Sequence, residues 1–185
     1  KDNCNLEALH CSKISSEEIR DSCVAELARI KNDVAVCKLI TGEKTKGFCQ
    51  EQLAIAANNH DLCLAITDTY WRDNCDYHLA TANNKDTYCS LIGDQPQKED
   101  CFLKIALATD NWELCSTFES PLKTEDCIKS IAVKLKNPTI CQEIANPLGE
   151  DICLKKVARE ANNKELCQRI SFKEVKDACI EAFRK

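Results

Sequence analysis

Apolar residues recur along the chain with a period of 26 residues, and the period is present seven times. In each copy they stand mainly one, four and five positions after the second of two cysteines. These offsets share one face of an α-helix, whereas a half-buried strand would alternate every second residue. The fifth offset is a small residue in six copies, as close helix packing requires. These residues are Ala28, Ala54, Ala80, Ala106, Ala132 and Ala158.

A second set of apolar residues surrounds the first cysteine of each copy. Three positions after it stand Ile14, Ile40, Ile66, Ile92, Phe118, Ile144 and Ile170. We therefore expect a first helix of about nine residues and a second of about 15, estimated from the turn signals. Such a unit cannot bury its apolar face alone, so stacked copies are expected. The predicted fold is an all-α solenoid of seven helical hairpins, with residues 1–10 as a lead-in and residues 11–185 as a single repeat domain.

Helix boundaries have recognisable signals in every copy. Between the paired cysteines stand residues that suit an N-cap, namely Ser16, Gly42, Asp68, Asp94, Ser120 and Asn146. Pro121 and Pro147 follow at the first helical position. Ser171 and Glu174 have the spacing of a capping box. Between copies, pairs such as Asn32-Asp33, Asn58-Asn59 and Asn137-Pro138 predict a helix end and a tight turn.

Fourteen of the 15 cysteines lie on the repeat, separated alternately by 12 and 14 residues. Across the shorter spacing, the two cysteines of a hairpin lie about equally far from the turn. Across the longer spacing they would be offset by about 7 Å along the helix axes, too far for good disulfide geometry. We therefore predict these pairs: Cys11–Cys23, Cys37–Cys49, Cys63–Cys75, Cys89–Cys101, Cys115–Cys127, Cys141–Cys153 and Cys167–Cys179.

Cysteine usage and charge limit where the chain works and what it binds. A disulfide framework favours an oxidising compartment, and the start at Lys1 with no methionine suggests a mature form whose leader was removed. The net charge of −5 argues against nucleic acid or an anionic membrane as partner. No apolar run is long enough for a membrane span. We expect a secreted or cell-surface protein.

Catalytic and metal-binding motifs are absent from the sequence. No nucleophile motif, phosphate loop or C-x-x-C pair occurs, and the cysteines lack the clustered spacing of a zinc site. We therefore expect no enzyme activity, no cofactor and no metal.

Aromatic residues concentrate in the third repeat and form the candidate binding site. Tyr70, Trp71, Tyr77 and His78 lie close together in the sequence. Tyr77 and His78 fall in columns (positions 26 residues apart) that elsewhere hold charged residues such as Glu51 and Lys129, which predicts exposure to solvent. Exposed aromatic residues are frequent in protein interfaces.

The two ends of the array carry a second hypothesis. Cys4 lies outside the repeat and could form a disulfide to another chain. Leu6 and Leu9 could cover the first repeat or dock on another molecule, while Ile180 and Phe183 continue the apolar columns to the last repeat. An open array whose ends are not capped exposes apolar faces.

The motif C-x-x-I, followed by C-x-x-x-[LI]-A and [ND]-x-x-L-C, is illustrated by Cys141-Gln-Glu-Ile144 and Cys153-Leu-Lys-Lys-Val-Ala158. Over residues 11–179 it resembles cysteine-rich helical repeats of exported, largely uncharacterised proteins, many of them archaeal. The architecture is similar to tetratricopeptide and Sel1-like solenoids, which implies protein binding on a concave surface. We expect an exported, non-enzymatic scaffold or protein-binding module, with a filament subunit stacked end to end as the alternative.

Overall fold

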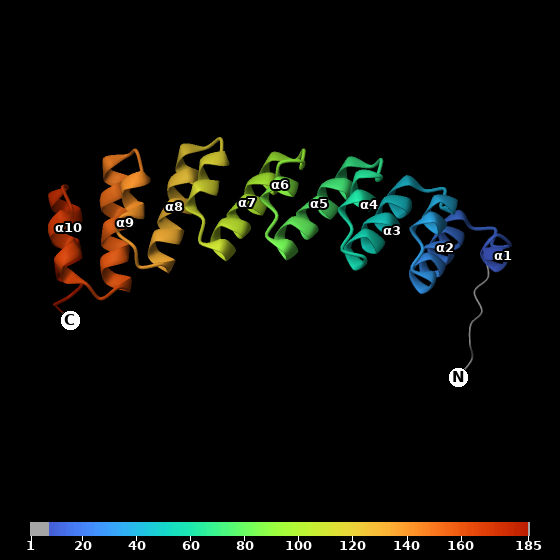
Figure 1. The fold of residues 1–185 in the computed structure, drawn as a ribbon, viewed down its shortest axis with the longest axis horizontal. Helices are drawn as coiled ribbons and strands as arrows, with labels where there is room; N and C mark the ends of the chain where they lie inside the picture. The colour runs from blue at the N-terminus through green and yellow to red at the C-terminus, as the bar shows by residue number, and fades with distance from the viewer. Residues whose placement is uncertain (1–7, 185) are drawn as a thin grey trace. The chain divides into compact units, whose positions relative to one another are not determined.

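The computed structural model describes residues 8–184, which form a regular series of helical hairpins (Figure 1). Each hairpin pairs a short first helix with a longer second one. The first helices are α1 (Ala8–Cys11), η1 (Val34–Leu39), α4 (His60–Leu64), α6 (Asp86–Cys89), η2 (Trp112–Thr117), η3 (Ile140–Glu143) and η4 (Lys164–Arg169). The second helices are α2 (Glu17–Lys31), α3 (Glu43–Ala56), α5 (Thr69–Asn83), α7 (Gln95–Thr109), α8 (Pro121–Lys134), α9 (Pro147–Glu160) and α10 (Lys173–Glu181). The predicted repeated helical hairpin is confirmed.

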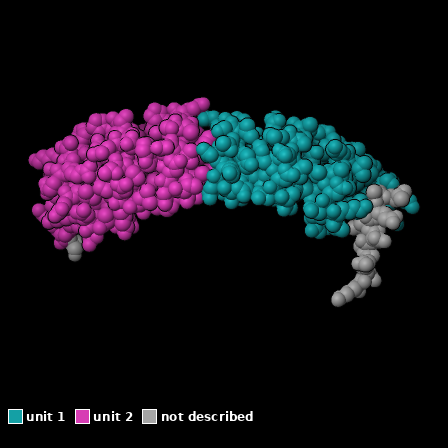
Figure 2. Space-filling view, in the orientation of Figure 1, with its two compact units in different colours: residues 1–98 teal, residues 99–185 magenta. Residues whose placement is uncertain are grey.

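The chain divides into two compact units, residues 1–98 and residues 99–185, which are coloured separately in Figure 2. Within the first unit, α2 packs against α3 and α3 against α5. Within the second unit, α8 packs against α9 and α9 against α10. The long helices of successive hairpins are therefore neighbours in each unit.

From the second hairpin to the last, the first helix is shorter than the predicted nine residues. Described first helices contain four to six residues, and η1, η2, η3 and η4 are 3-10 helices. The reason is visible in repeat 2, where Asp33 caps the start and the chain leaves the helix at Ile40, whose backbone is extended. Ile40 is buried and its N–H donates to the carbonyl of Cys37. The inward-pointing isoleucine therefore marks the end of the helix.

A left-handed residue ends six of the long helices at a spacing of 26 residues. These residues are Asn32, Asn58, Asn84, Asp110, Lys136 and Asn162. The residue that follows donates its N–H to the carbonyl of the repeat alanine: Asp33 to Ala28 at 3.0 Å, and Asn163 to Ala158 at 2.8 Å. This 6→1 bond is the Schellman arrangement. All six alanines have no exposed surface, so each both closes its helix and lies at the inter-helix contact.

The disulfides follow the predicted pairing. Six of them, each across 12 residues, have Cα–Cα distances of 5.6 to 5.9 Å. Cys89 and Cys101 are also disulfide-bonded. The predicted set of seven regularly spaced disulfides is therefore confirmed.

Six repeats have an acidic residue two positions before the second cysteine (the carboxylate column), and three of these residues link consecutive hairpins. Asp21 accepts the backbone N–H groups of Thr41 at 3.1 Å and Gly42 at 2.7 Å. Asp73 accepts those of Gly93 and Asp94 at 2.9 and 3.0 Å. Each of these carboxylates is buried and receives the N–H groups that precede the next long helix. A negative charge at the N-terminus of a helix also interacts favourably with the helix dipole.

The predicted capping box at Ser171 and Glu174 is wrong, because a carboxylate of the preceding repeat caps α10 instead. The N-cap of α10 is Phe172, without a side-chain cap bond. The N–H groups of Ser171 and Phe172 donate to Asp151 at 3.0 and 2.7 Å. Because a carboxylate of the preceding repeat takes over the capping, a residue without a polar side chain is tolerated at the N-cap of α10, as Gly42 is at that of α3.

Replacement of Asp151 by alanine is expected to destabilise the start of α10. The N–H groups of Ser171 and Phe172 would lose their hydrogen bonds to the buried carboxylate of Asp151, each worth about 1.5–3 kcal/mol. We expect native-state hydrogen exchange to show local opening at these amides easier by about 2 kcal/mol or more. Asp177→Ala is the matched control, since Asp177 holds the same column but is exposed, and it should change stability by less than about 0.5 kcal/mol. Equal effects of the two variants would refute the linking role.

Candidate functional site

The predicted aromatic residues Tyr70 and Trp71 lie at the start of α5 and belong to a larger row. Their ring centroids are 4.9 Å apart in an edge-on arrangement. Trp71 also contacts Phe48 of α3, at 5.2 Å between ring centroids. Tyr70 is 65% exposed and Phe48 is 45% exposed, so the row presents aromatic surface to solvent. We call Phe48, Trp71 and Tyr70 the aromatic row.

The indole of Trp71 occupies space that is open because Gly47 has no side chain. The carboxylate column holds Gly47 in repeat 2, and a Cβ atom built there would lie only 2.3 Å from Cδ1 of Trp71. The indole therefore packs directly over the backbone of α3, in the position where other repeats carry an acidic side chain. Trp71 is both an inter-repeat packing residue and the middle of the aromatic row.

Phe48 was not predicted from the sequence, although a signal exists. The residue before the second cysteine is polar in four other repeats, as Ser22, Asn74, Asp100 and Asp126, and is Ile152 or Ala178 in the last two. An aromatic ring in this mostly polar column indicates a contact with something other than water. Phe48 lines a groove of about 600 Å³ between α2 and α3. The groove is also lined by Ala25, Leu53 and Ala56, with polar residues that include Ser22, Glu26, Arg29, Asn32 and Gln52.

Tyr77 and His78 lie further along α5 and contact each other, with ring centroids 5.6 Å apart. His78 is exposed and Tyr77 is half-buried. The expectation that the column of Tyr77 faces solvent is wrong, because Glu51 in the same column is buried. Burial raises the pKa of the Glu51 carboxyl, while a hydrogen bond from Gln52 and the nearby His78 act to lower it. His78 on α5 therefore interacts with Glu51 on α3 while its side chain stays exposed, and Tyr77 is only half-buried.

His60, Asp76 and Tyr88 form a polar cluster in the same unit, in which Asp76 is buried and the other two are half-buried. The Nε2 atom of His60 is 2.9 Å from Oδ1 of Asp76, and its ring stacks on that of Tyr88 with centroids 3.8 Å apart. Asp76 has no exposed surface. Its column is apolar in five other repeats, as Val24, Phe102, Ile128, Leu154 and Ile180, and holds Gln50 in repeat 2, so a carboxylate stands at a core position here.

The environments of Asp76 and Asp21 shift their pKa values in opposite directions. Burial raises the pKa of Asp76, with Asp73 adding to the effect, although His60 and Arg72 act to lower it. Burial also acts to raise the pKa of Asp21, but the hydrogen bonds from Gly42 and Thr41 outweigh it and the net pKa is lowered. Backbone donors favour the ionised form, whereas desolvation disfavours it.

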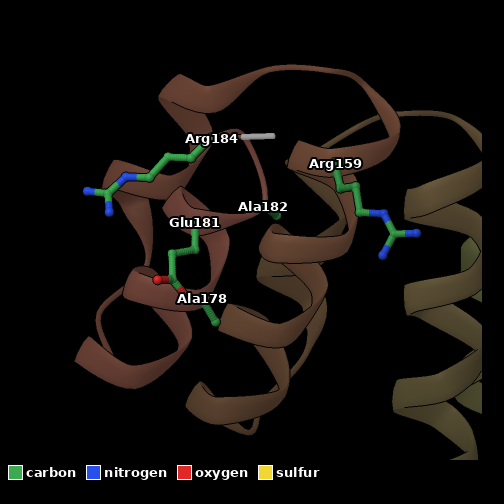
Figure 3. Close-up of a pocket in the computed structure, with 5 residues that line it drawn as sticks. All are labelled: Arg159, Ala178, Glu181, Ala182 and Arg184. Atoms are coloured by element: carbon green, nitrogen blue, oxygen red, sulfur yellow. The ribbon is translucent and has the colours of Figure 1, made fainter.

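A second cavity, of about 690 Å³, lies between α9 and α10 and is lined by Arg159, Ala178, Glu181, Ala182 and Arg184 (Figure 3). The two guanidinium groups do not converge, since they extend away from each other. This cavity therefore lacks the paired cations that would clamp an anion.

The residues predicted to form assembly ends are only partly described. Ile180 and Phe183 are half-buried and pack on the core of the second unit, which also contains Ile131, Leu154 and Val157. Cys4 and Leu6 lie outside the described residues, and so does the side chain of Leu9.

Across residues 8–184, no group of three or more histidine, cysteine or acidic side chains is placed to hold a metal ion. Over the same residues, no helix combines the length and apolar character needed to cross a membrane.

The shifted pKa values predict opposite effects of pH on two variants. Since the folded pKa of Asp76 is raised, the unfolded chain loses its proton first and stability is lost as pH rises above about 4. Asp76→Asn removes this loss. The urea midpoint of the variant, relative to that of the wild type, should therefore increase as pH rises from about 4 to 7.

Asp21→Asn provides the internal control for this prediction. The lowered pKa of Asp21 contributes stability that is present above about pH 4 and is lost as pH falls. The urea midpoint of this variant, relative to that of the wild type, should therefore decrease as pH rises from about 2 to 4. Parallel pH profiles for the two variants would contradict the assignment of opposite environments.

No protein-family model, curated protein or solved structure matches the chain. The resemblance to exported cysteine-rich repeat proteins therefore stays a prediction. The confirmed hairpin repeat, the disulfides and the surfaces described above are what a functional proposal has to rest on.

Proposed function

We propose that the chain is a non-enzymatic protein-binding module that is exported and works in an oxidising compartment. The observation that carries the proposal is the aromatic row beside the groove between α2 and α3. Phe48 belongs to both, because it contacts Trp71 and lines the groove. A protein partner that buries these rings would remove exposed aromatic surface from water.

The composition of this surface supports a protein rather than a small molecule as ligand. Interface hot spots are enriched in tryptophan and tyrosine, surrounded by polar residues that exclude water. The groove is open along two helices and combines apolar residues with Ser22, Asn32 and Gln52, whose side chains can hydrogen-bond a peptide backbone. An extended or helical segment of a partner suits such a groove better than a compact ligand does.

The disulfides support the proposed compartment. A chain in which every described cysteine of the repeat is disulfide-bonded suits an environment in which thiols are kept oxidised. Export follows as the simplest route to such an environment, and it is part of the proposal.

The proposal is tested by selecting peptides from a displayed random library against the oxidised protein. Affinities of the selected peptides are then measured by calorimetry. We expect the double variant Phe48→Ser, Tyr70→Ser to bind at least about tenfold more weakly, because two exposed hot-spot rings are lost. Both side chains are substantially exposed, so the hairpins should remain folded.

Leu122→Ser is the matched control. Leu122 is 70% exposed and occupies the second position of α8, as Tyr70 does in α5. Its replacement should change the affinity by less than about twofold. The proposal fails if no peptide is enriched, or if the selected peptides bind the double variant as well as they bind the wild type.

A further inference from the structure

A small cavity between the fifth and sixth repeats has an unusual charge. It has a volume of about 270 Å³ and lies where the exit of η2 and the start of α8 meet the exit of η3. Phe118, Ile128 and Ile144 form its apolar part. Glu119, Glu125 and Glu143 also line it, and none of its lining residues is basic.

The three carboxylates are not neutralised by the chain. Within residues 8–184, none of them makes a hydrogen bond or an ion pair. The lysines of the same helix are engaged elsewhere, Lys123 with Glu99 and Lys129 with Asp126. Glu125 belongs to the carboxylate column, yet it has no backbone partner of the kind that Asp21 and Asp151 have.

The corresponding place in the first repeat holds a basic side chain. Arg20 lies there and donates from its guanidinium to the carbonyl of Ile14 at 3.3 Å. In the last repeat, Lys176 donates in a similar way to the carbonyl of Gln168 at 3.1 Å. Arg20 stands three positions before the second cysteine. Five repeats have a basic residue at this position, namely Arg20, Lys46, Arg72, Lys98 and Lys176.

Repeat 5 has Thr124 at this position instead of a basic residue. Thr124 lines the cavity, and its hydroxyl donates to the carbonyl of Ser120. Glu119 and Glu143 stand where the first site has Ser15 and Leu39, whereas Pro121 stands where it has Glu17. The cavity therefore has no cation of its own and has three acidic residues, Glu119, Glu125 and Glu143, where the first site has two, Glu17 and Asp21. Gly149 leaves room for Glu125, since a Cβ atom at position 149 would lie 2.7 Å from its Oε2.

We propose that this cavity receives a lysine or arginine side chain from a protein partner, in the place that Arg20 fills in the first repeat. The apolar residues would contact the aliphatic part of the side chain and the carboxylates would accept from its charged end. The volume lies below the roughly 300–1,000 Å³ of small-molecule sites and suits one side chain. The site lies in the unit of residues 99–185, so it does not depend on the aromatic row.

The test is a titration of the isotope-labelled, oxidised protein with a blocked pentapeptide that carries one arginine between glycines, followed by NMR. We expect saturable shifts of the Thr124, Ala145 and Gly149 amides, with a dissociation constant of about 1 mM or below. The same peptide with citrulline, which is nearly isosteric but uncharged, should give no saturable shift. Saturable binding of the citrulline peptide would overturn the proposal, as would the absence of binding by the arginine peptide.

Three variants locate the binding. Thr124→Arg restores the chain's own basic residue and should abolish the shifts. Glu125→Gln keeps the shape, removes one charge and should weaken binding about tenfold. Glu160→Gln removes an exposed charge outside the cavity and should have no effect.

Binding that survives both cavity variants, or that Glu160→Gln weakens equally, would show only diffuse attraction of charge and would overturn the proposal. If Thr124→Arg disturbs the fold, Glu125→Gln decides alone. The proposed aromatic surface can fail its own test without affecting this result, because the two experiments use different ligands and different variants.

Discussion

The disulfide across each hairpin is the constraint on which the other contacts depend. A helix of four to six residues is not stable alone, because helix nucleation costs more than so few hydrogen bonds return. The cysteine in it is tied to the long helix with Cα atoms 5.6–5.9 Å apart. Such a loop contributes about 3 kcal/mol in the chain-entropy model. With the short helix held, its inward isoleucine and the turn that follows acquire fixed positions.

Consecutive hairpins are linked by non-covalent means that use the backbone. A buried carboxylate of one repeat accepts the N–H groups at the start of the next long helix, as Asp21, Asp73 and Asp151 do. A fully buried alanine in each of six repeats allows close approach and accepts the bond that ends its own helix. The capping of a helix is thus a property of two repeats together, which explains why Gly42 and Phe172 can occupy N-cap positions.

The features with functional potential arise where a repeat departs from this scheme. Gly47 replaces the carboxylate and admits Trp71, which builds the aromatic row. Asp76 replaces a core residue and brings in His60 and Tyr88. Thr124 replaces a basic residue and leaves an acidic cavity. Each departure changes the contacts of its own repeat and leaves the disulfides and helix ends of the hairpin in place.

The sequence by itself determined the period, the helical hairpins and the disulfide pairing, because these depend on spacing along one chain. It also identified Tyr70 and Trp71 as members of an aromatic concentration in the third repeat. It did not reveal the length of the short helices, the N-cap at Phe172 or the burial of Glu51, because each depends on groups from a different helix. The partner of Asp151 lies 20 residues away and that of Trp71 lies in another repeat. Only the tertiary structure brings such residues together, since the contacts between repeats decide which polar side chains are buried and which find a backbone partner.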